Sequence, residues 1–349
     1  MIETWNCMKL HTSLLQKDLF CLFTAPVAKG KTRSILELYQ ENILRIVFVS
    51  PLRALANEIK EKLKTEKNIY LLGEEEGHLT NKEKCINFLT KKKSMIITTV
   101  ELLEDDFLEM IELESDPILF VLDEFHLFYQ WGESFRPILF DKFLAMLNTS
   151  HPMIALSATM NEEVMEKLKF DLNFNFEYWV HLNWGNLELY RLPTKTRVFN
   201  RQETAIIERA FRRELKAKKP EEVFLYFCQY RQEVDDKLQW AKRNGYKAIG
   251  CVGGEVVRFQ KELNEHQGPL DCIFSTIALS HGVNLPEIRK VFIGYEVKNY
   301  DLWLQMVGRG GRQGSEYQIY TFDNFEHNQW RDFLKYIKIK IEDVFDCEF

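Results

Sequence analysis

The chain has 349 residues, which is too long for one ordinary α/β domain and suits two domains of roughly 150 to 180 residues each. A formal net charge of -6 excludes a generally basic protein, so any contact with nucleic acid has to come from a local groove. No apolar run approaches the roughly 18 residues of a membrane span, and seven cysteines without a C-x-x-C pair indicate a reducing, cytoplasmic location and neither a zinc nor an iron–sulfur site.

The first predicted strand, LFCLFT, is followed at once by APVAKGKT (residues 25–32) and then by a helical pattern. A strand, a Gly-Lys-Thr turn and a helix form a phosphate-binding loop, in which backbone amides and the helix N-terminus hold the phosphates. Lys31 would neutralise the phosphates and the hydroxyl of Thr32 would ligate Mg²⁺. The loop departs from the usual pattern because Ala25 and Ala28 stand where glycine is common.

Two later strand ends carry candidate contacts to a sugar–phosphate backbone. Arg53 lies in the first turn of a helix that starts just after Pro51, where the helix dipole does not favour a cation. It is therefore a candidate phosphate ligand, and a plain surface arginine is the alternative. Thr98 and Thr99 end the strand in MIITTVELLE, where a hydroxyl suits a sugar–phosphate contact or a helix cap.

The centre of the chain is an apolar run over residues 118–122 that ends in Asp123 and Glu124, with His126 two positions on. This pattern predicts a buried parallel strand that delivers side chains to a site at its carboxyl end. One carboxylate could hold Mg²⁺ through water while its neighbour polarises an attacking water. A solvated strand end is the alternative for an isolated Asp–Glu pair, and the phosphate loop favours the metal–phosphate site.

The strand MIALSATM carries Ser157 and Thr159, whose hydroxyls can hydrogen-bond the DEFH loop and sense its state. Alternating strands and helices up to about residue 180 predict a parallel sheet with helices on both faces. The composition then changes, and we expect a connection over residues 192–202. A second series of strands and helices follows it.

The second half carries STIALSHGVNLP and QMVGRGGRQG, and the latter places Arg309 and Arg312 among glycines after Gln305. Two arginines three residues apart can present two guanidinium groups to one target. In a chain with one phosphate loop, that target would be the γ-phosphate, which makes them candidates for an arginine finger in cis. The alternative is a phosphate of a nucleic acid.

The segments APVAKGKT, SPLRALA, TTVELL, DEFH, SAT, STIALSHGVNLP and QMVGRGGR occur in this order over essentially the whole chain. This set resembles superfamily two helicases of the DExH type. The stretch QWGESFRP further resembles the aromatic-rich loop that follows the DExH box in RecQ-type DNA helicases, and LQMVGRGGRQG is similar to theirs.

The resemblance implies two tandem RecA-like α/β domains, each a mainly parallel sheet with helices on both faces. ATP and Mg²⁺ would occupy the cleft between the domains, and single-stranded nucleic acid would lie across both. We expect the first domain over residues 1–191, a linker over 192–202 and the second domain over 203–349.

The resemblance also implies roles for residues of the nucleotide site. Lys31 would bind the β and γ phosphates, Thr32 and Asp123 would hold Mg²⁺, and Glu124 would be the catalytic base. Further residues implied to bind the nucleotide are Ala28, Lys29, Gly30 and Gly282. Those implied to act near the γ-phosphate are Gln305, Arg309 and Arg312, of which Arg312 is the preferred finger. Those implied to couple hydrolysis to domain motion are His126, Ser157 and Thr159.

The aromatic loop after the DEFH box combines flat rings with a cation. Trp131 and Phe135, with Arg136 beside them, could stack bases, hold phosphate and report polymer contact to the carboxylates. The alternative is that the two rings bury into the first domain. Further candidate contacts to nucleic acid are Arg53, Thr99, Ser275 and Thr276.

The expected function is ATP-driven translocation on single-stranded or partly duplex DNA, with 3′ to 5′ polarity. An RNA helicase is one alternative, and an ATP-gated binding subunit of a larger repair or defence complex is another. Asn6 stands where RecQ-type relatives carry an adenine-reading glutamine, and nothing after the last motif resembles their zinc-binding and winged-helix modules. An accessory protein would then supply a wedge or a nuclease.

Overall fold

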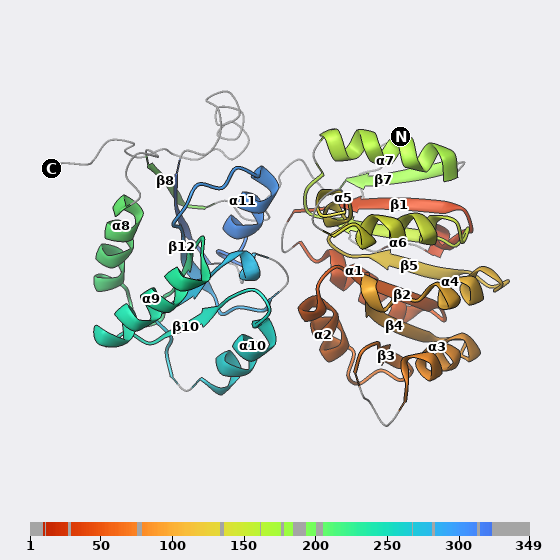
Figure 1. Ribbon diagram of the computed structural model, residues 1–349, viewed down its shortest axis with the longest axis horizontal. Helices are drawn as coiled ribbons and strands as arrows, with labels where there is room; N and C mark the ends of the chain where they lie inside the picture. Colours follow the sequence, from red (N-terminus) through yellow and green to blue (C-terminus); the bar gives the residue numbers. More distant parts are fainter. Residues whose placement is uncertain are drawn as a thin grey trace. The chain divides into compact units, whose positions relative to one another are not determined.

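The computed structural model describes residues 10, 12–26, 29–74, 79–132, 136–160, 162–175, 178–183, 193–199, 205–266, 268–280, 283–312 and 315–322. The chain divides into two compact units, Met1–Glu188 and Leu189–Phe349 (Figure 1). Within the described ranges, no helix combines the length and the apolar character that crossing a membrane requires.

The first unit contains a seven-stranded sheet, in which every paired strand is parallel, with the order β3-β4-β2-β5-β6-β1-β7. The strands are β1 Leu19–Thr24, β2 Arg45–Ser50, β3 Ile69–Leu71, β4 Ser94–Thr99, β5 Ile118–Leu122, β6 Met153–Ser157 and β7 Tyr178–Asn183. All residues of β2, β4, β5 and β6 are buried, as expected for strands that are covered on both faces.

Helices cover both faces of this sheet, which confirms the predicted layers. The helices are α1 Lys31–Glu41, α2 Arg53–Lys62, α3 Asn81–Thr90, α4 Asp105–Glu112, α5 His126–Gln130, α6 Ile138–Leu147 and α7 Glu162–Asn175, with 3-10 turns at Thr12–Leu15 and Val100–Leu102. One apolar core joins the sheet to α1 and α2, and a separate core joins it to the helices α3 to α7.

The second unit contains a six-stranded parallel sheet with the order β10-β11-β9-β12-β13-β8. Its strands are β8 Lys195–Phe199, β9 Val223–Phe227, β10 Ala248–Cys251, β11 Cys272–Ser275, β12 Ile288–Ile293 and β13 Gln318–Phe322. Its helices are α8 Ala205–Lys216, α9 Arg231–Arg243, α10 Val256–Glu265 and α11 Tyr300–Val307, with a 3-10 turn at Ile277–Leu279.

Strand β8 lies within residues 192–202, where the sequence predicts only a linker. It pairs with β13 in parallel, so this part of the expected connection belongs to the second sheet. Thr196 is buried, and the ring of Phe199 stacks on that of Tyr320 with centroids 6.5 Å apart. Cross-strand packing of this kind stabilises an edge strand that the mixed composition of the segment does not reveal.

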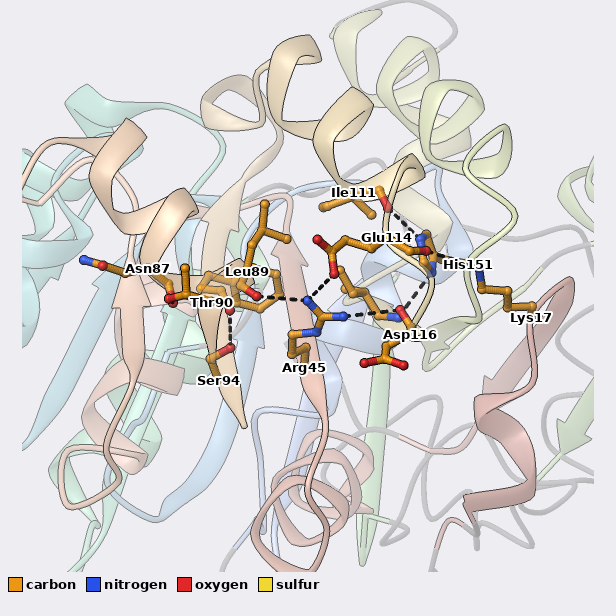
Figure 2. A network of polar contacts seen from close by, with 12 residues as sticks. Lys17, Arg45, Asn87, Leu89, Thr90, Ser94, Ile111, Glu114, Asp116 and His151 are labelled. Carbon is orange, nitrogen blue, oxygen red and sulfur yellow. Dashed lines mark hydrogen bonds and ion pairs between the residues drawn. The ribbon is translucent and has the colours of Figure 1, made fainter. Parts of the chain in front are cut away.

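In the first unit, a polar network lies at the amino ends of the strands (Figure 2). The guanidinium of Arg45, whose side chain is only 6% exposed, donates to Glu114 Oε2 at 2.7 Å and to the carbonyl of Leu89 at 3.2 Å. The ring of His151 accepts from the amide of Ile118 through Nδ1, so its Nε2–H donates to the carbonyl of Ile111 at 2.8 Å. These contacts therefore fix the C-terminal ends of α3 and α4, and the segment after α4, to the amino ends of β2 and β5.

We predict that Arg45→Ala lowers the free energy of unfolding of the first unit by about 3 kcal/mol, because it removes a buried guanidinium and leaves the half-buried Glu114 and the carbonyl of Leu89 without their donor. Arg33, which is 81% exposed in an ion pair with Glu37 on α1, offers a matched control. Its alanine variant should change stability by less than about 0.5 kcal/mol. Urea unfolding followed by circular dichroism measures both, and equal losses would contradict the structural role of Arg45.

Candidate nucleotide and nucleic-acid site

The phosphate loop connects β1 to α1. Gly30 has φ 90°, a left-handed conformation that favours glycine, and its carbonyl accepts the amide of Ser34 at 3.0 Å as α1 begins. The ammonium of Lys31 donates to the carbonyls of Ala25 at 2.8 Å and Pro26 at 3.3 Å, so it lies across the loop. With the amides at the start of α1 and the nearby hydroxyl of Thr32, the loop offers the donors that a phosphate needs.

The DEFH box follows β5 and is held on both sides by its neighbours. The amide of Asp123 donates to the carbonyl of Val49 at 2.9 Å, and the amide of Phe125 donates to the carbonyl of Leu156 at 2.8 Å. Between them, Glu124 adopts φ 46°, which is strained for a residue with a side chain. The ring of Phe125 is fully buried in an aromatic cluster, so its bulk serves packing.

Burial controls the charge of Asp123. Desolvation, with a further contribution from the neighbouring Glu124, raises the pKa of its carboxyl to about 7, while the charge of Lys31 opposes the rise. A divalent cation would favour the ionised form. One buried carboxylate beside a phosphate loop fits Mg²⁺, which takes one or two carboxylates together with phosphate and water oxygens.

The described residues offer few side chains that could ligate a metal ion. Within the described ranges, no group of three or more His, Cys, Asp or Glu side chains could hold a metal ion alone. The Oε2 atom of Glu124 is buried and has no hydrogen-bond partner among the described residues, which leaves it available to a bound water.

His126 connects the DEFH box to the SAT segment. The hydroxyl of Ser157 donates to the carbonyl of Thr159 at 2.6 Å, so it accepts the Nδ1–H of His126 at 3.0 Å. Burial, aided by the charge of Lys31, lowers the pKa of His126 to about 3, and the ring is neutral. The hydrogen bond that the sequence predicts between these segments is therefore present.

The nucleic-acid candidates of the first unit have partners within that unit. Arg53 donates to the carbonyl of Leu72 after β3. Thr99 is buried and starts a 3-10 turn without a side-chain cap bond, so the capping alternative is not realised. Trp131 is half-buried and packs against the core that joins the sheet to helices α3 to α7. Arg136 forms an ion pair with Glu101, a partner that the sequence analysis missed.

In the second unit, Arg309 and Arg312 differ in exposure. Arg309 is 1% exposed and donates to the carbonyl of Val283 at 2.8 Å, whereas the half-buried Arg312 donates through Nε to the carbonyl of Gly308 at 2.9 Å. Arg312 is therefore the more accessible of the two guanidinium groups. A Cβ at Gly310 would meet the ring of Tyr317 at 2.1 Å, so this glycine serves packing.

The other candidates of the second unit are buried or lie outside the described residues. Gln305 is 3% exposed within α11. Ser275 is fully buried, and its hydroxyl lies within hydrogen-bond distance of the carbonyls of Cys251 and Thr276. The candidates outside the described residues are Asn6, Ala28, Phe135 and Gly282.

Two family models match the chain: DEAD/DEAH box helicase over residues 8–168 and helicase conserved C-terminal domain over residues 206–314. The RecQ-like DNA helicase BLM of Xenopus laevis is 26% identical over 304 residues, covering 80% of this chain and 21% of that protein. The probable ATP-dependent DNA helicase RecS of Bacillus subtilis (strain 168) is 27% identical over 280 residues, covering 77% of this chain and 54% of that protein.

A solved structure of Mss116p bound to ssRNA and AMP-PNP superposes with a TM-score of 0.67 at 15% identity, covering 95% of this chain and 72% of that one. The fold is thus that of tandem RecA-like domains. The chain belongs to the DEAD/DEAH box helicases, and its core is similar to that of RecQ-type DNA helicases. It spans about half the length of the RecS relative and about a fifth of the BLM relative.

We predict that Asp123→Asn stabilises the protein increasingly as the pH rises. The folded-state pKa of Asp123 is raised from 3.8 to about 7, so the wild-type protein loses stability over that interval, because unfolding releases the proton that the buried carboxyl retains. Asparagine has no such charge. Thermal unfolding between about pH 5 and pH 8, without metal or nucleotide, should show a difference in Tm that grows up to about pH 7 and then levels off.

The matched control is Asp116→Asn, which changes an exposed carboxylate just before β5. Its difference in Tm from the wild type should stay small and nearly constant with pH. An Asp123→Asn difference that is equally independent of pH would contradict the buried ionisation.

Proposed function

We propose that the protein is an ATP-dependent translocase on single-stranded DNA that moves 3′ to 5′. The observation that carries this proposal is the buried hydrogen bond between His126 and Ser157. It joins the segment with the two carboxylates to the SAT segment, at the same edge of the sheet as the phosphate loop. Such a connection can transmit a change at a nucleotide to the rest of the domain.

In this proposal, the residues of the first unit bind and polarise ATP. Lys31 exchanges its loop carbonyls for the β and γ phosphates, and Thr32 and Asp123 are the residues that would hold Mg²⁺. The metal, when bound, neutralises charge on the phosphates. Glu124 orients and deprotonates the attacking water, a role supported by its buried oxygen and its constrained backbone.

The second unit would contribute Arg312 to the γ-phosphate when the two units close on ATP. An arginine finger stabilises the charge of the transition state, and its withdrawal after hydrolysis would complete one step. We assign this role to Arg312 because Arg309 is buried and donates to the carbonyl of Val283. Arg309 would instead hold the loop that follows α11.

We favour DNA as the polymer because the relatives BLM and RecS are named as DNA helicases. The RNA-bound structure of Mss116p is similar in fold alone at 15% identity. The proposed polymer contacts come from Arg53, Thr99, Trp131, Arg136 and Thr276. Ser275 is left out because it has no exposed surface, whereas Thr276 keeps 9% of its surface exposed. The expected accessory protein, which would supply a wedge or a nuclease, remains part of this proposal.

Steady-state ATPase rates with single-stranded DNA, single-stranded RNA of matched sequence and no polymer test the proposal. We expect stimulation by DNA of about tenfold or more, and Glu124→Gln should lower the stimulated kcat by about 10² to 10⁴ because the base is lost. Equal rates in all three conditions would contradict translocation. Greater stimulation by RNA would identify the polymer as RNA.

A further inference from the structure

Three candidate polymer-binding segments of the first unit meet at one side chain, Arg136. Its Nε and Nη2 atoms contact the carboxylate of Glu101, and its Nη1 donates to the carbonyl of Pro51. Pro51 follows β2, the 3-10 turn with Glu101 follows β4, and Arg136 lies after β5 and α5. Because these strands are adjacent and parallel in the order β4-β2-β5, all three segments lie at the carboxyl edge of the sheet.

The backbone positions both partners of this ion pair. The amide of Arg136 donates to the carbonyl of Trp131 at 2.7 Å, and its own carbonyl accepts the amide of Leu139 at 3.0 Å, next to the start of α6. Glu101 lies within the turn Val100–Leu102 that begins directly after Thr99. The contact is therefore built into the fold of the edge and does not depend on two freely moving surface side chains.

The pair is accessible to solvent. The side chain of Arg136 is 23% exposed and that of Glu101 is 42% exposed. Ion pairs with this exposure contribute little to stability, because water and salt screen them. A guanidinium that donates to a carboxylate can donate in the same way to a phosphate.

We propose that the carboxylate of Glu101 pairs with Arg136 in the free protein and that a phosphate of single-stranded nucleic acid displaces it. This inference rests on the proposed function and assigns a new task within it. In this proposal Glu101 acts through Arg136, so it is a positioning residue that sets how much polymer is needed for stimulation. A phosphate that binds Arg136 would also compete with its hydrogen bond to the carbonyl of Pro51. This bond links the segment after α5 to the segment after β2.

The displacement of Glu101 from Arg136 can affect the proposed catalytic carboxylates through α5. Trp131, whose carbonyl holds the amide of Arg136, immediately follows α5. The first residue of α5 is His126, which contacts Ser157 and lies 3.7 Å from Glu124 Oε2 through Nδ1. A displaced Arg136 would thus alter the end of a five-residue helix whose other end lies at the catalytic base.

Glu101→Gln tests the inference because it removes the competing charge and keeps the size of the side chain. The Kd for a fluorescein-labelled oligo-dT, measured by anisotropy, should fall about threefold or more, since Arg136 no longer has a charged competitor. The slope of log Kd against log salt should steepen by up to about 0.7, the value for one phosphate contact on a single strand, because no Glu101 carboxylate is released to take up a cation when the polymer binds. The oligonucleotide concentration for half-maximal ATPase should fall by a similar factor.

Two further variants make the result specific. Glu112→Gln removes an exposed carboxylate on α4 and should leave Kd and its salt slope unchanged. In the Arg136→Ala background, Glu101→Gln should bring no gain in affinity, because the cation that it releases is absent. A gain that persists in this background would overturn the inference, since it would reflect general charge.

The outcomes also separate this inference from the proposed function. If DNA stimulates the wild-type protein but Glu101→Gln leaves Kd unchanged, or only lowers Tm, Glu101 is a structural residue and the inference alone is wrong. If the wild-type protein neither binds oligo-dT nor is stimulated by it, both are wrong. If it binds without stimulation, the affinity measurements still decide the role of Glu101.

Discussion

The functional edge of the first unit depends on how the chain leaves β5. Backbone hydrogen bonds from Asp123 to Val49 and from Phe125 to Leu156 tie this exit to β2 on one side and to β6 on the other. The strand is buried along its whole length, so its end cannot shift without breaking bonds to both neighbours. The position of Glu124, with its strained backbone, follows from being held between these two anchors.

The same burial produces two opposite electrostatic effects within four residues. It raises the pKa of Asp123 and lowers that of His126, because a dry environment disfavours the charged form of each. The neutral ring can then donate from Nδ1 to Ser157 without adding positive charge beside Lys31. The proposed cation ligand Asp123 and the proposed coupling residue His126 therefore share one desolvated site.

Sequence analysis predicted the features that depend on local order along the chain. The two parallel sheets, the helix after the phosphate loop and the contact between the DEFH and SAT segments follow from strands that end in polar residues. Tertiary packing decided the rest. The edge strand β8 depends on β13, the burial of Arg309 depends on the carbonyl of Val283, and the partner of Arg136 comes from a segment 35 residues earlier. Such pairings leave no periodic signal.

The central claim is that the hydrogen bond from His126 to Ser157 couples hydrolysis to movement. The most direct measurement compares ATPase activity with streptavidin displacement from biotin-tagged single-stranded DNA, on one preparation of Ser157→Ala. The account predicts that stimulated ATPase stays within about fivefold of the wild type while displacement per ATP falls about tenfold or more. Hydrolysis and displacement that fall together, or that both stay unchanged, would contradict it.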